Sequence, residues 1–243
     1  MDDVLNNNHE DFNELGDQSV PSEDNVLKNV EKPVGGFAPA PQTEKLPASE
    51  RLLEVMHRDE QYFGKLAPER IVQAKSSPEE MKKFLDEQRL ANRVHRLEVQ
   101  AMLDKGELKT DSDFDTAAVI FQHGFSPEDS KTAFKLSLKA IGAGQPAEAA
   151  LTPAAFDRFM IHTQLNQGIP IERVKQRFGK QTYPDAQGNM FKPALDGQAT
   201  PDELQLFGIH LPDSDQPVDN ANLDQGKLLA SLTDKLNTYK LAV

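Results

Sequence analysis

Four Ser-Pro or Thr-Pro dipeptides recur along the chain, beginning at Ser77, Ser126, Thr152 and Thr200. Each is a helix-start signal, because the hydroxyl accepts hydrogen bonds from the free N–H groups of a first turn and proline suits the first helical position. Their spacing follows no fixed period, so they do not indicate a repeat protein. No segment alternates apolar and polar residues with the period of two that a half-buried strand shows. We therefore predict an all-α fold.

The helices that these signals and the apolar spacing predict fill the middle of the chain. They begin at Ser49, with Leu52, Leu53, Met56 and Phe63 on one face, and continue through 78–104, 116–123, 127–141, 152–167, 170–178, 204–207 and 224–239. The helix over 116–123 is apolar almost all round, which is typical of a central helix. The sequence thus predicts a single compact helical domain over residues 49–210, followed by a polar linker and a C-terminal amphipathic helix over 211–243.

Residues 1–48 differ from the rest in composition. Ten carboxylates against three lysines give this segment a net charge of −7, out of −12 for the whole chain. Such a segment buries too little apolar area to offset the entropy of ordering it, so we predict a disordered acidic tail. A solvated tail is the interpretation we favour, and a docking or secretion segment is the alternative.

The overall composition excludes several classes of function. The chain has no cysteine, which rules out disulfides, thiolate metal sites and a cysteine nucleophile. The acidic balance argues against nucleic acid as a partner, because phosphate contacts need an excess of Lys and Arg. No apolar run reaches the length of a membrane span, and the N-terminus shows no secretory signal. We expect a cytoplasmic location, with export by a leaderless route left open, and no cofactor.

Two local patterns leave a decision to the structure. In the helix over 78–104, one face carries Gln88, Asn92 and His95 among apolar residues, as a buried polar network or pocket wall would. The other face, with Leu90 as one of its apolar residues, is an equally good candidate for burial.

The run Asp111–Asp115 has the early carboxylate spacing of a calcium loop. It lacks the glycine and the bidentate glutamate that such a loop needs, so we expect no metal site.

The stretch from Leu151 to Gln181 holds the densest group of unusual polar residues. Thr152 is its expected cap and Gly168 its expected helix stop. We hypothesise a catalytic set in which His123 acts as a base, Asp157 orients it and Arg158 holds an anionic group of the substrate. A second set, expected to bind an amide or carbonyl of the ligand, consists of Gln122, Gln176 and Gln181. The ligand would be a small polar or peptide-like molecule.

Two alternatives stay open beside this hypothesis. The first is structural: Asp157 and Arg158 form ion pairs and the glutamines bond to backbone, since buried polar groups need partners whether or not they do chemistry. The second is functional: the chain is a non-catalytic protein-interaction module with acidic disordered segments. The sequence contains none of the common nucleophile, phosphate-loop or dinucleotide motifs that would decide between an enzyme and a binding protein.

The order of these motifs resembles an uncharacterised bacterial family of all-α domains over about residues 50–210. The shared elements are a helix ending in Gln122-His123, a helix bearing Asp157-Arg158, and the run from Gln176 to Gln181. The family pattern reads QHA, then L-T-D-R, then G-x-x-Q-x-Y-G-T-Q. This chain departs from it with Gly124 for Ala, Ala155-Phe156 for Leu-Thr, Phe178 for Tyr and Lys180 for Thr. The resemblance implies positions for a site and no reaction; if the family has a chemistry that uses the Tyr or Thr hydroxyl, this chain lacks that hydroxyl at Phe178 and Lys180.

Overall fold

A computed structural model of the chain describes residues 46–63, 72, 77–184, 190–209 and 224–239. The all-α class is confirmed over these residues, where helices make up nearly all regular structure. The predicted acidic tail lies outside them up to residue 45. The helices are α2 (Ala48–Phe63), α4 (Pro78–Asp104), α5 (Asp111–Gln122), α6 (Pro127–Ala143), α7 (Thr152–Asn166), α8 (Pro201–Leu206) and α9 (Gln225–Thr238).

Short elements join the last helices. Two 3-10 turns, η3 (Ala147–Ala149) and η4 (Ile171–Arg173), flank α7. Four two-residue strands follow: β1 (Lys175–Gln176), β2 (Tyr183–Pro184), β3 (Met190–Phe191) and β4 (Ala194–Leu195). β1 pairs with β4 in parallel and β2 pairs with β3 antiparallel. These small ladders hold a loop against α7 and do not form a sheet layer.

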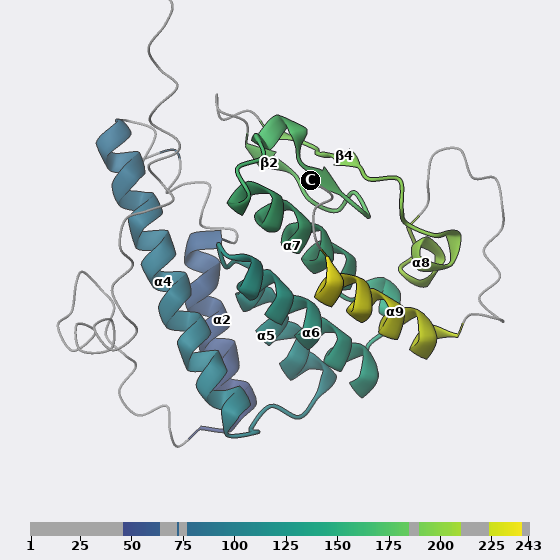
Figure 1. The fold of residues 1–243 in the computed structure, drawn as a ribbon. Coiled ribbons are helices and arrows are strands. Elements are labelled where there is room, and N and C mark those ends of the chain that lie inside the picture. The colour runs from purple at the N-terminus through teal and green to yellow at the C-terminus, as the bar shows by residue number, and fades with distance from the viewer. Residues whose placement is uncertain (1–45, 64–71, 73–76, 185–189, 210–223, 240–243) are drawn as a thin grey trace, which may run out of the picture. The chain divides into compact units, whose positions relative to one another are not determined.

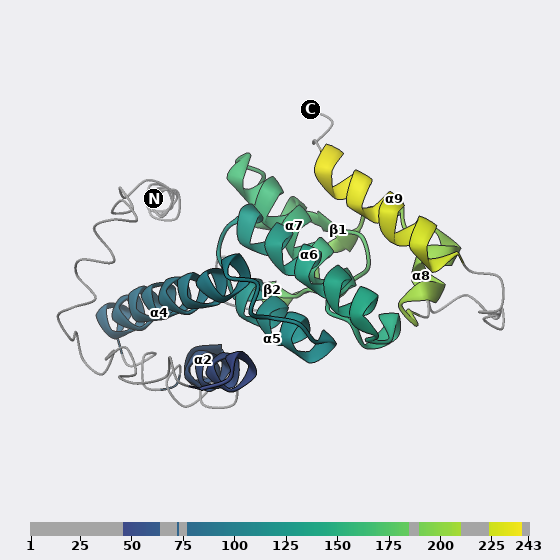
Figure 2. The same ribbon diagram turned by 90° about the horizontal axis from the view of Figure 1, so that it is seen from below.

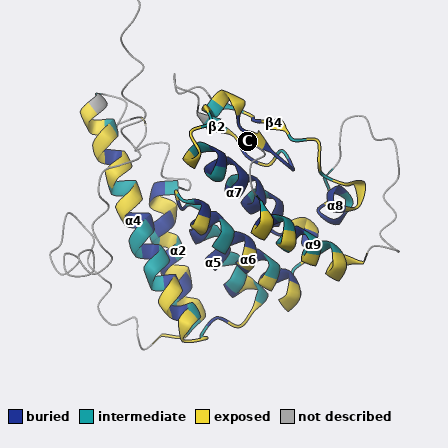
Figure 3. Ribbon diagram, in the orientation of Figure 1, coloured by how far each residue is buried: buried dark blue, intermediate teal, exposed yellow. Residues whose placement is uncertain are grey.

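Helices α5, α6 and α7 lie side by side as the centre of the domain (Figure 1). Helices α2 and α4 cover one side of this group, and α8 and α9 lie at the opposite side (Figure 2). Burial follows this arrangement, because the central helices are largely buried while the first half of α4 is largely exposed (Figure 3). Among the described residues, no helix has both the length and the apolar character needed to cross a bilayer.

Most helix starts occur where the Ser/Thr-Pro signals predict them. Ser77, Ser126 and Thr200 each accept a hydrogen bond from the backbone N–H three residues on. At Ser126 and Thr200 the acidic residue in that position returns the bond, which completes a capping box. Thr110 caps α5 in the same way through Asp113, so the run that resembles a calcium loop is a helix start.

The signal at Thr152 was interpreted wrongly. Leu151 is the N-cap of α7, and Thr152 lies inside the first turn, where its hydroxyl bonds to that of Ser137 at 2.8 Å. Both hydroxyls are fully buried. Because Ser137 donates to the Phe134 carbonyl oxygen, it accepts from Thr152, whose hydroxyl has no other partner among the described residues. The predicted helix over 170–178 was also wrong, because only the short turn η4 forms before the chain extends into β1.

The buried faces of α2 and α4 combine apolar and polar residues. In α2 the buried residues are Leu52, Val55, Asp59 and Tyr62, while Leu53 is exposed. In α4 they are Phe84, Ala91, Asn92, His95, Val99 and Met102. Over most of α4, the buried face is therefore the one that carries the polar residues. The Asn92 side-chain amide donates to the carbonyl oxygen of Ile120 in α5. A buried Asp, Asn and His between these helices mark a hydrogen-bonded contact.

A chain of aromatic side chains runs through the core from α6 to α8. Phe134 contacts Phe156, Phe156 contacts Phe178, and Phe178 contacts Phe207, each edge to face with centroids 5.6–5.8 Å apart. All four rings are nearly fully buried. Edge-to-face pairs favour this packing beyond the area they bury. The loop after α7 is thus part of the core through Phe178.

Helix α9 joins the same core. Its Leu232 and Leu236 are fully buried, and Lys235 pairs with Glu203 of α8 at 2.6 Å. The other oxygen of Glu203 accepts from Arg177 at 2.9 Å. A nearly buried carboxylate with two cationic partners is well compensated, because each partner offsets its desolvation. The C-terminal helix and the loop after α7 are therefore fixed by one shared acid.

Gly124, between α5 and α6, allows a close approach of the two helices. A Cβ atom added there would lie 2.3 Å from the Cβ of Asp129, below the 3.0 Å that real contacts respect. Asp129 cannot move away easily, because it completes the Ser126 capping box and pairs with Arg96. The close approach explains why this position requires glycine.

Gly124→Ala should therefore lower the free energy of unfolding by about 1–3 kcal/mol, the usual cost of overpacking. Gly142→Ala is the matched control, since no atom lies within 4 Å of its added Cβ. It lies near the end of α6 and should raise stability by up to about 1 kcal/mol, because alanine is the better helix former. Urea unfolding measures both changes, and equal effects of the two substitutions would refute the close-approach argument.

Candidate functional site

The Asp157 carboxylate organises the loop that follows α7. One oxygen accepts from the backbone N–H groups of Arg177 and Phe178 at 2.8 Å each, and the other accepts from Lys180 at 2.7 Å. The side chain is fully buried. Each oxygen is committed to backbone donors, so Asp157 does not orient His123. This corrects the expected catalytic pairing, and the physical reason is that three free loop N–H groups need an acceptor.

Arg158 lies beside Gln122 and Gln181, two residues that the sequence analysis assigned to a separate set. Arg158 donates to the Gln122 carbonyl oxygen at 2.5 Å and, through two nitrogens, to the Gln181 side-chain oxygen at 3.1 and 3.3 Å. Both glutamine amides donate to the Ala154 carbonyl oxygen, at 3.2 and 3.0 Å. We call these residues the Arg158 cluster. The structural alternative expects the glutamines to bond to backbone, and both do so. It also expects an ion pair at Arg158, but no described residue forms one with it.

Gln176 is a loop anchor. Its amide nitrogen donates to the carbonyl oxygens of Gln181 and Pro193, and its oxygen accepts from the Gln181 backbone N–H at 2.9 Å. The side chain is fully buried and these three bonds account for most of its capacity. Gln176 thus closes the turn that presents Lys180 and has little left to offer a ligand.

His123 points toward α2 and α4 instead of α7. Its Nδ1 donates to one Asp59 carboxylate oxygen at 2.5 Å, and the Nδ1 of His95 donates to the other at 3.0 Å. Burial alone would raise the pKa of the Asp59 carboxyl, but the bonds from His123 and His95 outweigh it and hold that pKa below its ordinary value. The His123 ring stacks on Phe63, with centroids 4.4 Å apart. This cluster joins three helices, and the sequence analysis missed Asp59.

Asp59 had a detectable signal. It lies seven residues after Leu52 and four after Val55, on the same helical face, so an acid interrupts an apolar pattern there. An acid in that position must be paired when the face is buried. The sequence shows that a partner is needed, but it does not show that two histidines from α4 and α5 supply it.

His162 lies in a second polar cluster that the candidate sets omitted. Its Nδ1 lies 3.2 Å from the Ser126 carbonyl oxygen and 3.0 Å from the Ser130 hydroxyl, and its Nε2 lies 2.9 Å from the Tyr183 hydroxyl. A carbonyl only accepts, so Nδ1 carries the proton and Nε2 accepts from the tyrosine. Burial, aided by the charge of Arg158, lowers the pKa of His162 to about 4. This histidine is neutral at physiological pH and holds β2 against α7.

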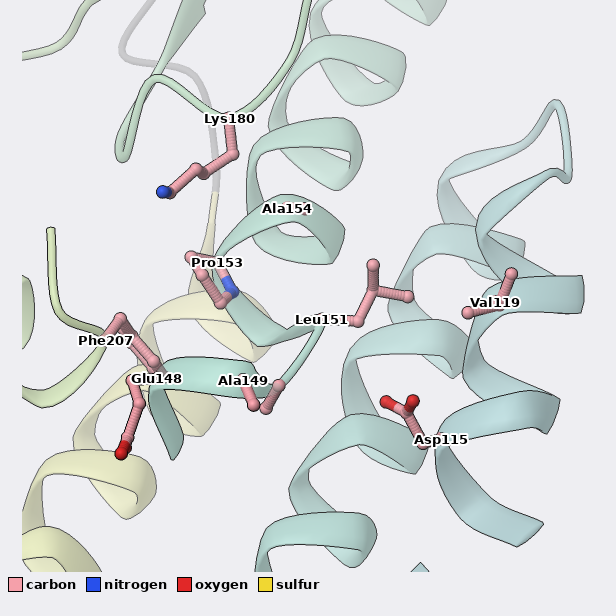
Figure 4. A pocket seen from close by; sticks show the side chains of 10 residues that line it. Asp115, Val119, Glu148, Ala149, Leu151, Pro153, Ala154, Lys180 and Phe207 are labelled. Atoms are coloured by element: carbon pink, nitrogen blue, oxygen red, sulfur yellow. The ribbon is translucent and has the colours of Figure 1, made fainter. Parts of the chain in front are cut away.

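A pocket of about 230 Å³ opens between α5, α7, η3 and the loop after α7 (Figure 4). Small and apolar residues form most of its wall: Val119, Ala149, Ala150, Leu151, Pro153, Ala154 and Phe207. Three charged residues complete it, namely Asp115, Glu148 and Lys180. Ala154 and Lys180 belong to the segments that the Arg158 cluster and Asp157 hold in place. The pocket is therefore next to the predicted residues, but its lining differs from the predicted set.

The charges around this pocket are unpaired among the described residues. Asp115, Glu148 and Lys180 form no ion pair with each other or with another described side chain. In contrast, the buried acids near the site, such as Asp157 and Glu203, have several donors each. No group of three or more His, Asp or Glu side chains in the described part of the chain could hold a metal ion.

The described residues define an all-α domain with a pocket beside its central helices. Comparisons with protein-family models, with curated proteins and with solved structures find no match for this chain. The resemblance to a bacterial helical family therefore stays a prediction, and the function has to be argued from the site itself.

The contributions of Asp157 and His162 to the free energy of unfolding should change in opposite directions as the pH rises. Burial outweighs the three backbone hydrogen bonds and raises the pKa of Asp157 from 3.8 to about 6, so its contribution is full below pH 3.8 and is lost as the pH rises through about 6. The pKa of His162 falls from 6.5 to about 4, so its contribution is full above pH 6.5 and is lost as the pH falls through about 4.

Between pH 4 and 6.5, the stability difference between wild type and Asp157→Asn should therefore shrink as the pH rises. The difference between wild type and His162→Gln should grow over the same range. Urea unfolding of the three proteins at several pH values measures both differences, and other titrating groups cancel in each comparison. Slopes of the same sign would contradict the opposite environments of the two side chains.

Gln181→Leu should lower the free energy of unfolding by about 1–3 kcal/mol, because two polar groups each lose a hydrogen-bond partner. The half-buried Arg158 guanidinium loses its side-chain acceptor, and the Ala154 carbonyl oxygen keeps only Gln122 as a side-chain donor. Gln167→Leu, at an exposed position after α7, is the control and should change stability by less than about 0.5 kcal/mol. An unchanged or raised melting temperature for Gln181→Leu would show that this side chain is held for a ligand instead of for the fold.

Proposed function

We propose that this domain binds a small polar or peptide-like ligand in the pocket between α5, α7 and the loop after α7. The proposal rests on one observation: most polar groups behind the pocket have hydrogen-bond partners, whereas the charged side chains at its rim have no ion-pair partner among the described residues. The rim side chains are those of Asp115, Glu148 and Lys180, and the exceptions behind the pocket are two buried atoms, Gln122 Oε1 and Arg177 Nε. Ligand sites combine an apolar wall with a few convergent polar groups, and this pocket has both.

The surroundings of the pocket support a preformed site. Asp157 fixes the backbone of Lys180, and the Arg158 cluster links α5 to α7 through the Ala154 carbonyl oxygen. A site held in its binding conformation loses little entropy when a ligand enters. Asp157 and the Arg158 cluster, which the sequence suggests as the site, thus hold the backbone of the pocket wall in place.

The pocket favours binding over catalysis. Among the described residues its lining contains no histidine, serine or threonine, and Asp115, Glu148 and Lys180 have no ion-pair partner that would activate one of them as a nucleophile. His123, the expected base, is turned toward Asp59, and the three proposed catalytic residues have separate partners. We therefore assign the domain a ligand-binding function and no reaction.

A non-catalytic interaction module is the second candidate. Leu85 and Leu90 on α4 and Phe125 after α5 are each more than a third exposed, and Arg89 lies over the Phe125 ring at 5.9 Å. Exposed apolar side chains near a projecting helix are a feature of protein contact surfaces. This surface becomes the leading candidate if the pocket binds nothing.

A substitution that fills the pocket tests the first candidate. A thermal-shift screen of small polar compounds and short peptides should find ligands, and at about 100 times its dissociation constant a ligand adds about 2.7 kcal/mol of stability. Ala154→Leu should abolish that gain, because a larger side chain occupies the pocket wall. Ala143→Leu, at an exposed helical position outside the pocket, should retain it. A gain that survives Ala154→Leu would place the ligand elsewhere.

A further inference from the structure

The charges of the pocket are segregated. In the view of Figure 4, Lys180 lies above Pro153 and Ala154, and both acids lie below them, Asp115 at the right and Glu148 at the left. The positive and negative groups do not reach each other, since no ion pair joins them. Their separation is maintained by the fold, because Lys180 follows the loop anchored on Asp157 while Asp115 belongs to α5.

The surface between these charges is apolar. Pro153, Ala154 and Leu151 occupy the middle of the view, and Val119 and Phe207 lie on its two sides (Figure 4). A ligand that spans the pocket therefore needs an apolar body with a polar group at each end. The volume of about 230 Å³ is below the range of about 300–1,000 Å³ for sites of drug-sized molecules, so the ligand is small.

We propose that the ligand is a small zwitterion whose two charges lie at opposite ends of an apolar body, such as a free dipeptide. This inference rests on the proposed ligand-binding function and specifies the class of ligand. Lys180 takes the carboxylate, and Asp115, at the right of the view, takes the ammonium group. Charge-assisted hydrogen bonds of this kind fix the direction of the ligand as well as adding affinity.

The same arrangement disfavours related ligands. A dianion of this length would place its second negative charge against Asp115, and a dication would place a positive charge against Lys180. A single α-amino acid carries both charges on one carbon atom, so it cannot reach both sides of the pocket at once. A dipeptide separates its termini by a peptide unit and two α-carbons, and a peptide of small apolar residues matches the wall.

The test is calorimetric titration of the full chain with the dipeptide Ala-Leu, its N-acetyl form, its C-terminal amide and free leucine. Ala-Leu should bind, and each of the other three should bind roughly three- to tenfold more weakly. Lys180→Gln should weaken Ala-Leu by a similar factor and leave the amide unchanged, because the amide has no carboxylate to lose. Asp115→Asn should weaken Ala-Leu and leave the N-acetyl form unchanged.

Matched controls lie on the same elements outside the pocket. Lys175→Gln, in β1, and Asp111→Asn, one turn before Asp115 in α5, should bind Ala-Leu like wild type. Equal binding of free and capped dipeptides overturns the zwitterion inference and leaves the binding function intact. Absence of Ala-Leu binding also overturns it. The binding function fails separately, when no compound of the wider screen gives stabilisation that Ala154→Leu removes.

Discussion

One buried carboxylate, that of Asp157, fixes the segment on which the second half of the domain depends. It accepts from three backbone N–H groups of the loop after α7. In this loop, Arg177 pairs with Glu203, Phe178 packs in the aromatic core and Lys180 lines the pocket. A loop packed into a core must satisfy its backbone donors, and a short acid on the adjacent helix is an economical acceptor because it offers two oxygens.

The polar interior around this acid consists of groups that constrain one another. Burial favours the neutral forms of both Asp157 and His162, and it shifts the pKa of the acid up and that of the histidine down. Arg158, half-buried between α5, α7 and the loop, has only neutral acceptors among the described residues. Its charge disfavours protonation of His162, which keeps Nε2 available to accept from Tyr183. The network thus fixes one tautomer and one position of β2.

The sequence predicts local features well because their causes are local. Ser126 and Thr200 cap helices through bonds that span three residues, and the end of α6 after Ala143 follows from a Gly-rich break. Thr152 is the instructive failure. Its hydroxyl has a partner fifteen residues away in Ser137, and a sequence signal for capping cannot register that competing bond. The helix expected over 170–178 failed likewise, since Phe178 is drawn into the aromatic core and its backbone onto Asp157.

The candidate site was predictable in part for the same reason. Gln122, Arg158 and Gln181 converge, because an unusual density of polar residues near an apolar helix forces them to pair. The density does not reveal which partners are chosen, so His123 was assigned to Asp157 when Asp59, sixty-four residues before it, is its partner. In the sequence, Asp115 stands out only as part of the run with calcium-loop spacing, and Glu148 does not stand out at all, because acids at helix starts are ordinary.

The polar residues of this domain are of two kinds: those whose side chains are paired within the fold, and those whose side chains have no ion-pair partner among the described residues. Asp59, Asp157 and Glu203 are buried, and the hydrogen bonds that satisfy them come from elements that they hold together. Further bonds to a ligand would compete with that role. Lys180 contributes its backbone to the Asp157 network while its side chain has no ion-pair partner among the described residues, so it belongs to both kinds. The fold thus fixes where the Lys180 backbone lies and leaves its side chain available to a ligand.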